Sequence, residues 1–261
     1  MRGNSFQGKR VVLTGASSGI GWYLATQLVQ AGANVVVTSR RAERLRQLRL
    51  ATGNPLKRLI AVPGDITDAD HRQHVIDTAA EQLGGIDILI NNAGIGAIGR
   101  FDQASPDRLR RIFDVDFFAA AEMTRLALPW LKEGREPAVC VVSSVLAHRG
   151  VPEKSEYCAA KFALRGWAES LRIELRGDGI AVVTVSPSTT RSEFFESLID
   201  SPRDARSFSF GCQSAQQVAG KVLRAIRRRK REVVLSPGGK ALVWLSRLAP
   251  GFTERLILAN Y

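Results

Sequence analysis

The sequence predicts an α/β fold, a single doubly wound domain with a seven-stranded parallel sheet flanked by helices. Short apolar runs alternate with longer segments in which apolar residues recur at helical spacing, a pattern typical of βαβ units. A glycine-rich turn joins the first apolar run to the first helical segment. With 261 residues and 45% hydrophobic content, the chain can bury one large core, so one domain over 1–261 is expected.

Each element follows from this alternation, in chain order. Strands are predicted at the short apolar runs 10–14, 34–39, 58–62, 86–91, 137–143, 180–185 and 231–235. Helices are predicted at 19–31, 42–51, 69–83, 107–132, 155–176 and 215–229. The tail 236–261 has two apolar clusters separated by Pro250, which predicts an amphipathic extension of one or two helices. In a doubly wound sheet the ligand is expected beyond the carboxyl ends of the strands.

The turn after the first strand has the residues of a pyrophosphate-binding loop. It reads Thr14-Gly15-Ala16-Ser17-Ser18-Gly19-Ile20-Gly21. Gly15 and Gly19 permit a tight turn, and Gly21 lets the helix and the strand pack closely. The N–H groups at the helix N-terminus then suit a pyrophosphate. The alternative is a glycine-rich turn without a ligand, and the matching strand and helix on its two sides argue against it.

Tyr157 and Lys161 are four positions apart on the predicted helix 155–176, so they share one face of it. A free phenol titrates near pH ~10, so work near neutral pH requires a pKa shift of about 3 units, or roughly 4 kcal/mol. One cation at ~4 Å in a half-buried site supplies about that much. The pair indicates a proton donor and its activator, although such a pair can also arise by accident.

Together with two further motifs, these residues resemble the short-chain dehydrogenases/reductases. Thr14-Gly-x-x-x-Gly-Ile-Gly21, Asn91-Asn-Ala-Gly94, Ser144 and Tyr157-x-x-x-Lys161 follow the order and spacing of that family over residues 8–235. The resemblance implies a Rossmann-type fold and hydride transfer between a nicotinamide and a carbonyl or alcohol carbon. It also implies that Tyr157 gives or takes the proton and that Ser144 hydrogen-bonds the substrate oxygen. Lys161 would hold the nicotinamide ribose and lower the pKa of Tyr157.

The residues after the second strand bear on the choice of cofactor. Arg40 and Arg41 stand where an acidic residue would hold a ribose diol, and arginine favours an added 2′-phosphate, so NADP is favoured over NAD. The alternative is a solvated, basic start of a helix, which the helix dipole opposes. The resemblance implies a cofactor site made of Gly15, Ser17, Ser18, Gly19, Ile20, Gly21, Arg40, Arg41, Asp65, Ile66, Asn92, Ala93, Gly94, Tyr157, Lys161, Pro187, Thr190 and Ser192.

Two residues depart from the pattern of the family. Asp116 stands where the family usually has an asparagine that helps to relay protons to the lysine. We expect Asp116 to keep this catalytic role, while its charge raises the pKa of Lys161 and weakens the effect of Lys161 on Tyr157. Ser188 stands where glycine is usual, and because glycine tolerates positive φ angles that serine does not, the substitution bears on the backbone shape there.

The substrate is expected to be a small or lipid-like carbonyl or alcohol, because the segment 190–214 is rich in phenylalanine. An alternative enzyme is a reductase of 3-oxoacyl thioesters carried by an acyl-carrier protein or coenzyme A. An alternative from another class is a nucleotide-binding sensor or scaffold with little chemistry. The family resemblance also implies a homodimer or homotetramer.

The net charge of +12 raises the question of an anionic partner. The basic run Arg227–Arg231 lies at the end of a predicted helix, where cations suit the dipole, so a solvated helix end is favoured. No zinc-finger or RNA-binding signature occurs, so dedicated nucleic-acid binding is not expected. An acidic carrier remains a candidate partner. We expect the tail 236–261 to cap the pocket or to pack across a dimer, and the alternative is that it rests on an anionic membrane.

The first residues and the cysteines bear on location and on metals. Residues 1–6 lack the apolar core of a signal peptide and no run approaches the ~20 apolar residues of a membrane span, so a cytoplasmic location is expected. Cys140, Cys158 and Cys212 show no ligand spacing with the three histidines, so no metal site is expected.

Overall fold

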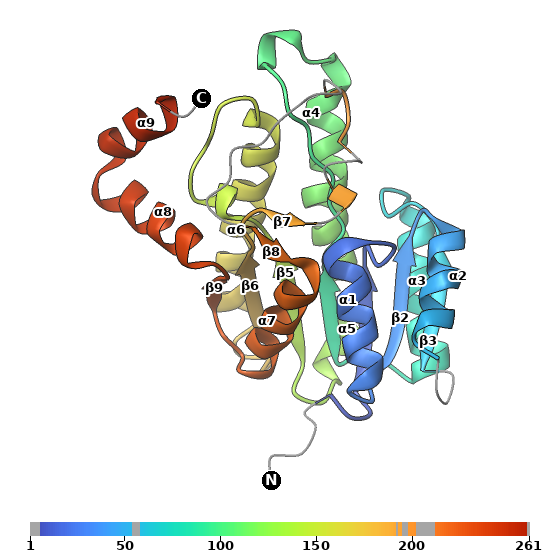
Figure 1. Cartoon of the computed structure of the whole chain (residues 1–261). Helices are drawn as coiled ribbons and strands as arrows, with labels where there is room; N and C mark the ends of the chain where they lie inside the picture. Colours follow the sequence, from blue (N-terminus) through green and yellow to red (C-terminus); the bar gives the residue numbers. More distant parts are fainter. Residues whose placement is uncertain (1–5, 54–57, 192, 195–197, 202–211, 260–261) are drawn as a thin grey trace.

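A computed structural model describes residues 6–53, 58–191, 193–194, 198–201 and 212–259 (Figure 1). Within these ranges, seven parallel strands form one sheet in the order β3-β2-β1-β4-β5-β6-β9. They are β1 (Arg10–Thr14), β2 (Asn34–Ser39), β3 (Leu59–Pro63), β4 (Ile88–Asn91), β5 (Ala138–Val142), β6 (Ala181–Ser186) and β9 (Glu232–Val234). The predicted doubly wound sheet is confirmed, and its strand order reverses between β1 and β4.

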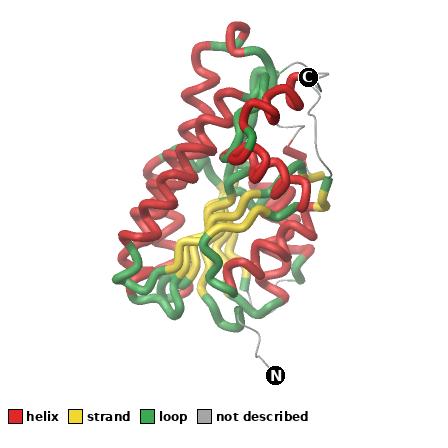
Figure 2. Tube along the Cα trace, turned by 90° about the vertical axis from the view of Figure 1, so that its left-hand side faces the viewer, coloured by secondary structure: helices red, strands yellow, loops and turns green. Residues whose placement is uncertain are grey.

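Helices cover both faces of the sheet (Figures 1 and 2). One face packs against α1 (Gly19–Gln30), α2 (Ala42–Ala51) and α7 (Ala215–Arg227). The other packs against α3 (Ala69–Leu83), α5 (Ala119–Lys132) and α6 (Ser155–Glu174). Successive strand residues point to opposite faces, so Val11 and Leu13 join the first core and Val12 joins the second. This two-sided burial explains why the strands read as continuous apolar runs.

The prediction of one continuous helix at 107–132 is wrong in its middle. A π-helical segment, η3 (Asp114–Phe118), joins α4 (Pro106–Phe113) to α5. Within η3 the buried residue is Asp116. A π turn carries one more residue per hydrogen-bonded ring than an α turn and is frequent at functional sites. Here it turns the side chain of Asp116 into the interior of the protein, at the point where the chain passes from α4 to α5.

Short elements complete the fold near the carboxyl ends of the strands. β7 (Thr190–Arg191) pairs with β8 (Gln213–Ser214), a pairing that the sequence did not predict. The 3₁₀ turns are η2 (Phe101–Gln103) and η4 (Val145–Ala147). The tail forms α8 (Pro237–Leu248) and α9 (Pro250–Leu258) at one side of the molecule, with Pro250 at the start of α9 (Figure 1). None of the helices in the described ranges is long and apolar enough to cross a membrane.

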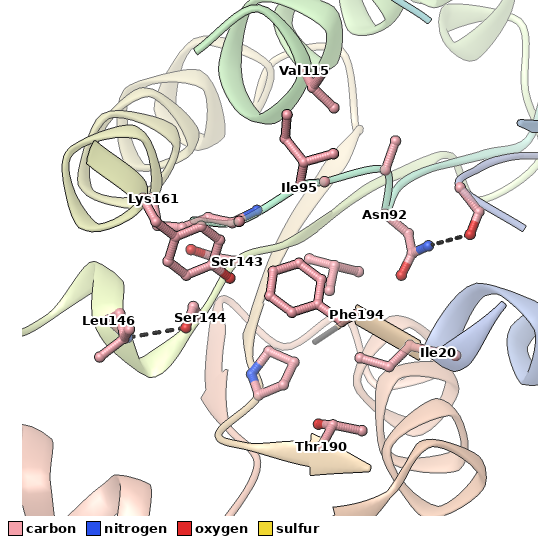
Figure 3. Close-up of a pocket in the computed structure, with 18 of the residues that line it drawn as sticks. Ile20, Asn92, Ile95, Val115, Ser143, Ser144, Leu146, Lys161, Thr190 and Phe194 are labelled. Carbon is pink, nitrogen blue, oxygen red and sulfur yellow. Dashed lines mark hydrogen bonds between the residues drawn. The ribbon is translucent and has the colours of Figure 1, made fainter. Parts of the chain in front are cut away.

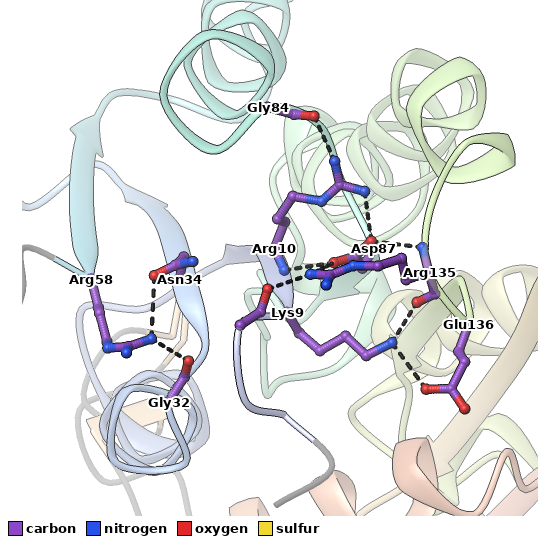
Figure 4. A network of polar contacts seen from close by, with 10 residues as sticks. Lys9, Arg10, Gly32, Asn34, Arg58, Gly84, Asp87, Arg135 and Glu136 are labelled. Atoms are coloured by element: carbon purple, nitrogen blue, oxygen red, sulfur yellow. Dashed lines mark hydrogen bonds and ion pairs between the residues drawn. The ribbon is translucent and has the colours of Figure 1, made fainter.

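A buried carboxylate ties together the amino ends of β1, β4 and β5 (Figure 4). The backbone N–H of Arg10 donates to Asp87 Oδ2 at 2.9 Å, and Arg10 Nη2 donates to Oδ1 at 2.7 Å. The N–H of Arg135 donates to Oδ1 at 2.8 Å. Burial alone would raise the pKa of Asp87, but the hydrogen bonds from Arg10 and Arg135 hold that pKa below its ordinary value. Asp87 therefore stabilises the end of the sheet opposite the carboxyl ends.

We expect Asp87→Asn to lower the free energy of unfolding by about 2 kcal/mol, because it removes charge-assisted hydrogen bonds in a buried site. The folded pKa lies below the unfolded one, so this contribution is complete above the unfolded pKa of about 4 and is lost as the pH falls through the folded pKa. Urea unfolding of both proteins at neutral and acidic pH measures it. The control is Glu136→Gln, because the Glu136 side chain is 81% exposed and its ion pair with Lys9, at 3.0 Å, lies at the surface. Equal losses in the two variants would contradict the prediction.

Candidate active site

A cavity of about 460 Å³ lies at the carboxyl ends of the strands and runs from the glycine turn to Tyr157. Figure 3 shows its walls, which come from distant parts of the sequence. The walls include Gly15, Ser17, Ser18, Gly19, Ile20, Gly21, Arg40, Arg41, Asp65, Ile66, Asn92, Ala93, Gly94, Pro187 and Thr190, together with Ser144, Tyr157 and Lys161. Ser192, the remaining residue expected at the cofactor, lies outside the described residues.

The glycines of the turn are required by its shape. Gly15 and Gly19 have φ angles of 70° and 53°, which side chains rarely permit. A methyl group on Gly15 would lie 2.7 Å from Ala93 Cα, and one on Gly21 would overlap the carbonyl oxygen of Gly15. The Asn92 side chain braces the turn, because its amide donates to the carbonyl oxygen of Gly15 at 3.0 Å. The turn is therefore fixed in a shape that a larger residue would break.

The N-terminus of α1 faces the cavity with its first-turn N–H groups uncapped by a side chain. Ser18 occupies the N-cap position without a side-chain hydrogen bond to the helix, and the first turn contains no acidic residue. Such an end attracts an anion through its N–H groups and its dipole. The rigid glycine turn and this helix end therefore fit the pyrophosphate of a dinucleotide.

Arginines gather beside the glycine turn. Arg41 donates to Ser17 Oγ from Nε and from Nη2, each at 3.1 Å, and Arg40 lines the cavity nearby. Arg44 joins them, because its Nη2 and the Nη1 of Arg41 contact the two carboxylate oxygens of Glu193 at 2.7 and 2.8 Å. The sequence analysis assigns neither Arg44 nor Glu193 to the cofactor site. The i, i+3 spacing of Arg41 and Arg44 was the signal that could have found the pair.

Ser144, Tyr157 and Lys161 converge at the other end of the cavity. Ser144 follows β5 and accepts a hydrogen bond from the N–H of Leu146 at 3.1 Å (Figure 3). Tyr157, on α6, lines the same end of the cavity as Ser144. One turn further along α6, Lys161 Nζ lies 5.5 Å from the centroid of the Tyr157 ring. The structure thus brings together the hydroxyl, the phenol and the cation that the sequence motifs indicate.

Asp116 lies behind Lys161 rather than on the cavity wall. Its Oδ2 is 3.0 Å from Lys161 Nζ, and its Oδ1 accepts a hydrogen bond from the N–H of Ile95 at 2.7 Å. Both charged side chains are buried. A methyl group on Gly94 would lie 3.3 Å from each of them, so the glycine leaves room for the ion pair. The π turn explains the close approach, because it directs Asp116 inward toward α6.

The pKa values of Tyr157 and Lys161 are both above their ordinary values. Burial alone would lower the pKa of Lys161, but the negative charges of Asp116 and of ionised Tyr157 raise it, in the direction expected from the sequence. Burial raises the pKa of Tyr157, Lys161 opposes this rise, and Asp116 adds to it. Lys161 therefore acts on the pKa of Tyr157 in the expected direction, but in the protein alone burial and Asp116 outweigh the cation, so this pKa stays above its ordinary value.

We expect Asp116→Asn to lower the pKa of Tyr157, because the substitution removes a negative charge that opposes ionisation of the phenol. Titration of tyrosinate absorbance measures this pKa, and subtraction of the same titration for Tyr157→Phe isolates the signal of Tyr157. The rise of the tyrosinate absorbance of Tyr157 with pH should occur at lower pH in the Asp116→Asn protein than in the wild type. An absorbance rise at the wild-type pH, or at a higher pH, would contradict the prediction.

The backbone at Ser188 takes an ordinary conformation. Ser188 is not among the described non-glycine residues with positive φ, which are Glu136, Glu153, Asp200 and Arg229. Its carbonyl oxygen accepts a hydrogen bond from Thr190 Oγ1 at 3.0 Å. Serine in place of the usual glycine therefore causes no strain of φ, and Thr190 still lines the cavity.

Beyond the catalytic groups the cavity is mostly apolar, although Glu153 and Lys154 also line it. Its walls there include Ile95, Ile98, Val145, Leu146, Val151, Leu198, Leu242 and Ile257. Leu242 and Ile257 belong to α8 and α9, so the tail closes one side of the cavity. Phe194 also projects into it (Figure 3), with its ring centroid 5.9 Å from that of Tyr157. In the part of the chain that the structure describes, no cluster of His, Cys, Asp or Glu is arranged to hold a metal ion.

Comparisons with known proteins agree with this geometry. The family model for short chain dehydrogenase matches residues 9–202. The ketoacyl reductase HetN of Nostoc sp. is 31% identical over 95% of this chain and 88% of its own length. A short-chain dehydrogenase/reductase of Burkholderia phymatum in complex with NAD shares the fold, with a TM-score of 0.85, 23% identity and coverage of 93% and 94% of the two chains. A short chain dehydrogenase of Burkholderia cenocepacia in complex with NADP gives a TM-score of 0.79, with 29% identity and coverage of 90% and 99%.

Proposed function

We propose, from the premise that this chain belongs to the short-chain dehydrogenase/reductase family, that it is an NADP-dependent reductase of a ketone or aldehyde on a small or lipid-like molecule. Membership makes the chain an oxidoreductase that acts on CH–OH or C=O groups with a nicotinamide cofactor. One observation carries the proposal. A single cavity joins a glycine turn and arginines at one end to Ser144, Tyr157 and Lys161 at the other.

The proposed catalytic roles are those that the family resemblance implies, and the positions of the side chains support them. The bound nicotinamide supplies or accepts the hydride. Tyr157 gives the proton to the substrate oxygen, and Ser144 donates a hydrogen bond to the same oxygen. Lys161 stabilises the phenolate of Tyr157 and holds the nicotinamide ribose. Asp116 is a positioning residue, because it holds Lys161 from behind through the ion pair of 3.0 Å.

The preference for NADPH is supported by the cations beside the glycine turn. Arg40 and Arg41 follow β2, where a ribose 2′-phosphate would lie, and Arg44 is within reach of the same anion as Arg41. Guanidinium groups match the oxygens of a phosphate in paired hydrogen bonds. The Burkholderia cenocepacia relative in complex with NADP, at 29% identity, is consistent with this choice.

A panel of carbonyl compounds tests the proposed reaction. Oxidation of NADPH and of NADH would be followed by absorbance with free ketones, aldehydes and 3-oxoacyl thioesters. We expect turnover of free carbonyls, with a kcat/KM at least about tenfold higher for NADPH than for NADH. Turnover of thioesters alone would favour the ketoacyl reductase alternative, which the similarity to HetN keeps open. Tight cofactor binding with no turnover of any compound would favour a sensor or scaffold.

The outer face of α8 and α9 supports a second proposal, which concerns a partner. The two helices carry apolar side chains that are mostly exposed, namely Trp244, Leu248, Phe252 and Leu258. The cations Lys240, Arg247 and Arg255 are also exposed on these helices. Trp244 and Leu248 are one turn apart and share a face, whereas Leu242 faces the cavity. Aromatic and aliphatic side chains beside cations are typical of helices that rest on an anionic membrane. We propose that α8 and α9 rest on an anionic membrane surface.

Co-sedimentation with phosphatidylserine vesicles tests this contact. We expect the protein to bind these vesicles. The double substitution Trp244→Ser with Leu248→Ser should weaken binding by about tenfold or more, because it removes apolar side chains that the membrane would bury. The matched control is Leu50→Ser, since Leu50 is 70% exposed on α2, away from the tail. Wild-type protein that stays in the supernatant would overturn the proposal. So would a tail variant that dissociates a dimer without changing the vesicle binding.

A further inference from the structure

Glu193 bridges the arginines at the adenosine end of the cavity. Its Oε2 lies 2.8 Å from Arg41 Nη1 and its Oε1 lies 2.7 Å from Arg44 Nη2. The contact joins residues 152 and 149 positions apart in the sequence. Glu193 follows β7 and precedes Phe194, whose ring lies against Tyr157. One short segment therefore reaches the basic end and the reactive end of the same cavity.

The guanidinium groups that Glu193 contacts are held in place by other residues. Arg41 is fixed on Ser17 Oγ, and Arg44 donates from Nε to the carbonyl oxygen of Ser17 at 3.3 Å. The Arg44 guanidinium also lies 5.0 Å from the centroid of the Trp22 ring. The donors are thus positioned at the glycine turn, and they present a site for one anion between them. Glu193 is the anion that occupies this site.

We infer that Glu193 competes with the 2′-phosphate of NADPH for Arg41 and Arg44, and so sets how strongly the protein prefers NADPH over NADH. This inference rests on the NADPH site proposed above. A carboxylate and a phosphate use the same guanidinium donors, so both cannot hold them at once. NADPH must displace Glu193, whereas NADH has no 2′-phosphate and leaves the contact intact. Glu193 therefore weakens the binding of NADPH without weakening that of NADH.

Phe194 provides an internal comparison for this effect. Its ring projects into the cavity near Tyr157, and its edge would contact a methyl group on Gly96. The nicotinamide end of the cofactor is the same in NADPH and NADH. A change at Phe194 therefore acts on both cofactors alike, whereas a change at Glu193 acts on one of them.

The size of the competition follows from the exposure of the ion pairs. The side chains of Glu193, Arg41 and Arg44 are between 35% and 47% exposed, so solvent screens their attraction. Loss of the two ion pairs that Glu193 makes is therefore expected to change the dissociation constant of NADPH by about 3- to 10-fold.

Fluorescence titration of NADPH and NADH into the purified protein tests the competition, with wild type, Glu193→Gln, Phe194→Ala and Glu43→Gln. The last is the matched control, because Glu43 pairs with Arg46 on α2 and does not contact the arginines of the site. We expect Glu193→Gln to tighten NADPH binding by about 3- to 10-fold and to leave NADH binding unchanged. Phe194→Ala should shift the two dissociation constants by the same factor, and Glu43→Gln should shift neither.

Three results would overturn the inference. Glu193→Gln could leave NADPH binding unchanged, weaken it, or change NADPH and NADH binding equally. In each of these cases, a wild-type preference for NADPH would still support the proposed cofactor site. If instead the wild type binds neither nucleotide, or prefers NADH, the proposed cofactor choice itself fails and the competition fails with it. The two failures are therefore distinguishable within one set of titrations.

Discussion

Tyr157→Phe is expected to lower kcat for carbonyl reduction by about 10³-fold, because it removes the proton donor and leaves the rest of the site in place. The ring keeps its position against Phe194 and above Lys161, since both contacts are made by the ring rather than by the hydroxyl. The dissociation constant of NADPH should therefore change by less than about threefold. Steady-state kinetics and a fluorescence titration of the same preparation measure the two effects.

A loss of activity without a loss of cofactor binding separates a catalytic role from a structural one. Ser143→Ala is a suitable control, because Ser143 also lines the cavity and stands next to Ser144. We expect this control to keep most of the wild-type kcat. Tyr157→Phe with more than about a tenth of the wild-type kcat would mean that another group supplies the proton.

Lys161→Ala is expected to lower both activity and stability, because the lysine neutralises a buried carboxylate. Lys161 and Asp116 are almost fully buried and lie 3.0 Å apart. Removal of the cation leaves Asp116 without its charge partner, which is expected to cost about 3–5 kcal/mol of the free energy of unfolding. Urea unfolding measures this loss, and the kinetics of NADPH oxidation measure the loss of activity.

The double variant Lys161→Ala with Asp116→Asn distinguishes the two roles of the lysine. It removes both charges, so most of the lost stability should return, because no uncompensated charge stays buried. Activity should not return, because the phenol of Tyr157 still lacks its cation. A double variant as unstable as Lys161→Ala alone, or one that regains activity, would contradict the assignment of Lys161.

The sheet could be predicted from the sequence because its central strands are buried on both faces and therefore read as uninterrupted apolar runs. The glycine turn and the Tyr157 and Lys161 pair could be predicted because their geometry is local. The π turn could not be predicted, because the apolar spacing on both sides of Asp116 continues as in an ordinary helix. β7 and β8 are too short to leave a periodic signal.

The remaining features of the site depend on contacts between distant residues. The bridge from Glu193 to Arg41 and Arg44 joins the segment after β7 to the start of α2, and no local pattern relates the two segments. The sequence indicated an acidic residue near Lys161, but the raised pKa of Tyr157 depends on the burial that only the assembled fold provides. At Ser188 the family pattern drew attention to the backbone, and the structure has no positive φ there.

Titration of NADPH and NADH into the wild type and into Arg40→Ala is the measurement that tests the proposed cofactor site most directly. We predict tight binding of NADPH by the wild type and a selective loss of NADPH binding in the variant, by about tenfold or more, because an arginine contact to the 2′-phosphate is lost. NADH binding should be unchanged, because NADH lacks that phosphate. Wild-type protein that binds neither nucleotide, or an Arg40→Ala variant that loses both equally, would contradict NADPH recognition by the arginines beside the glycine turn.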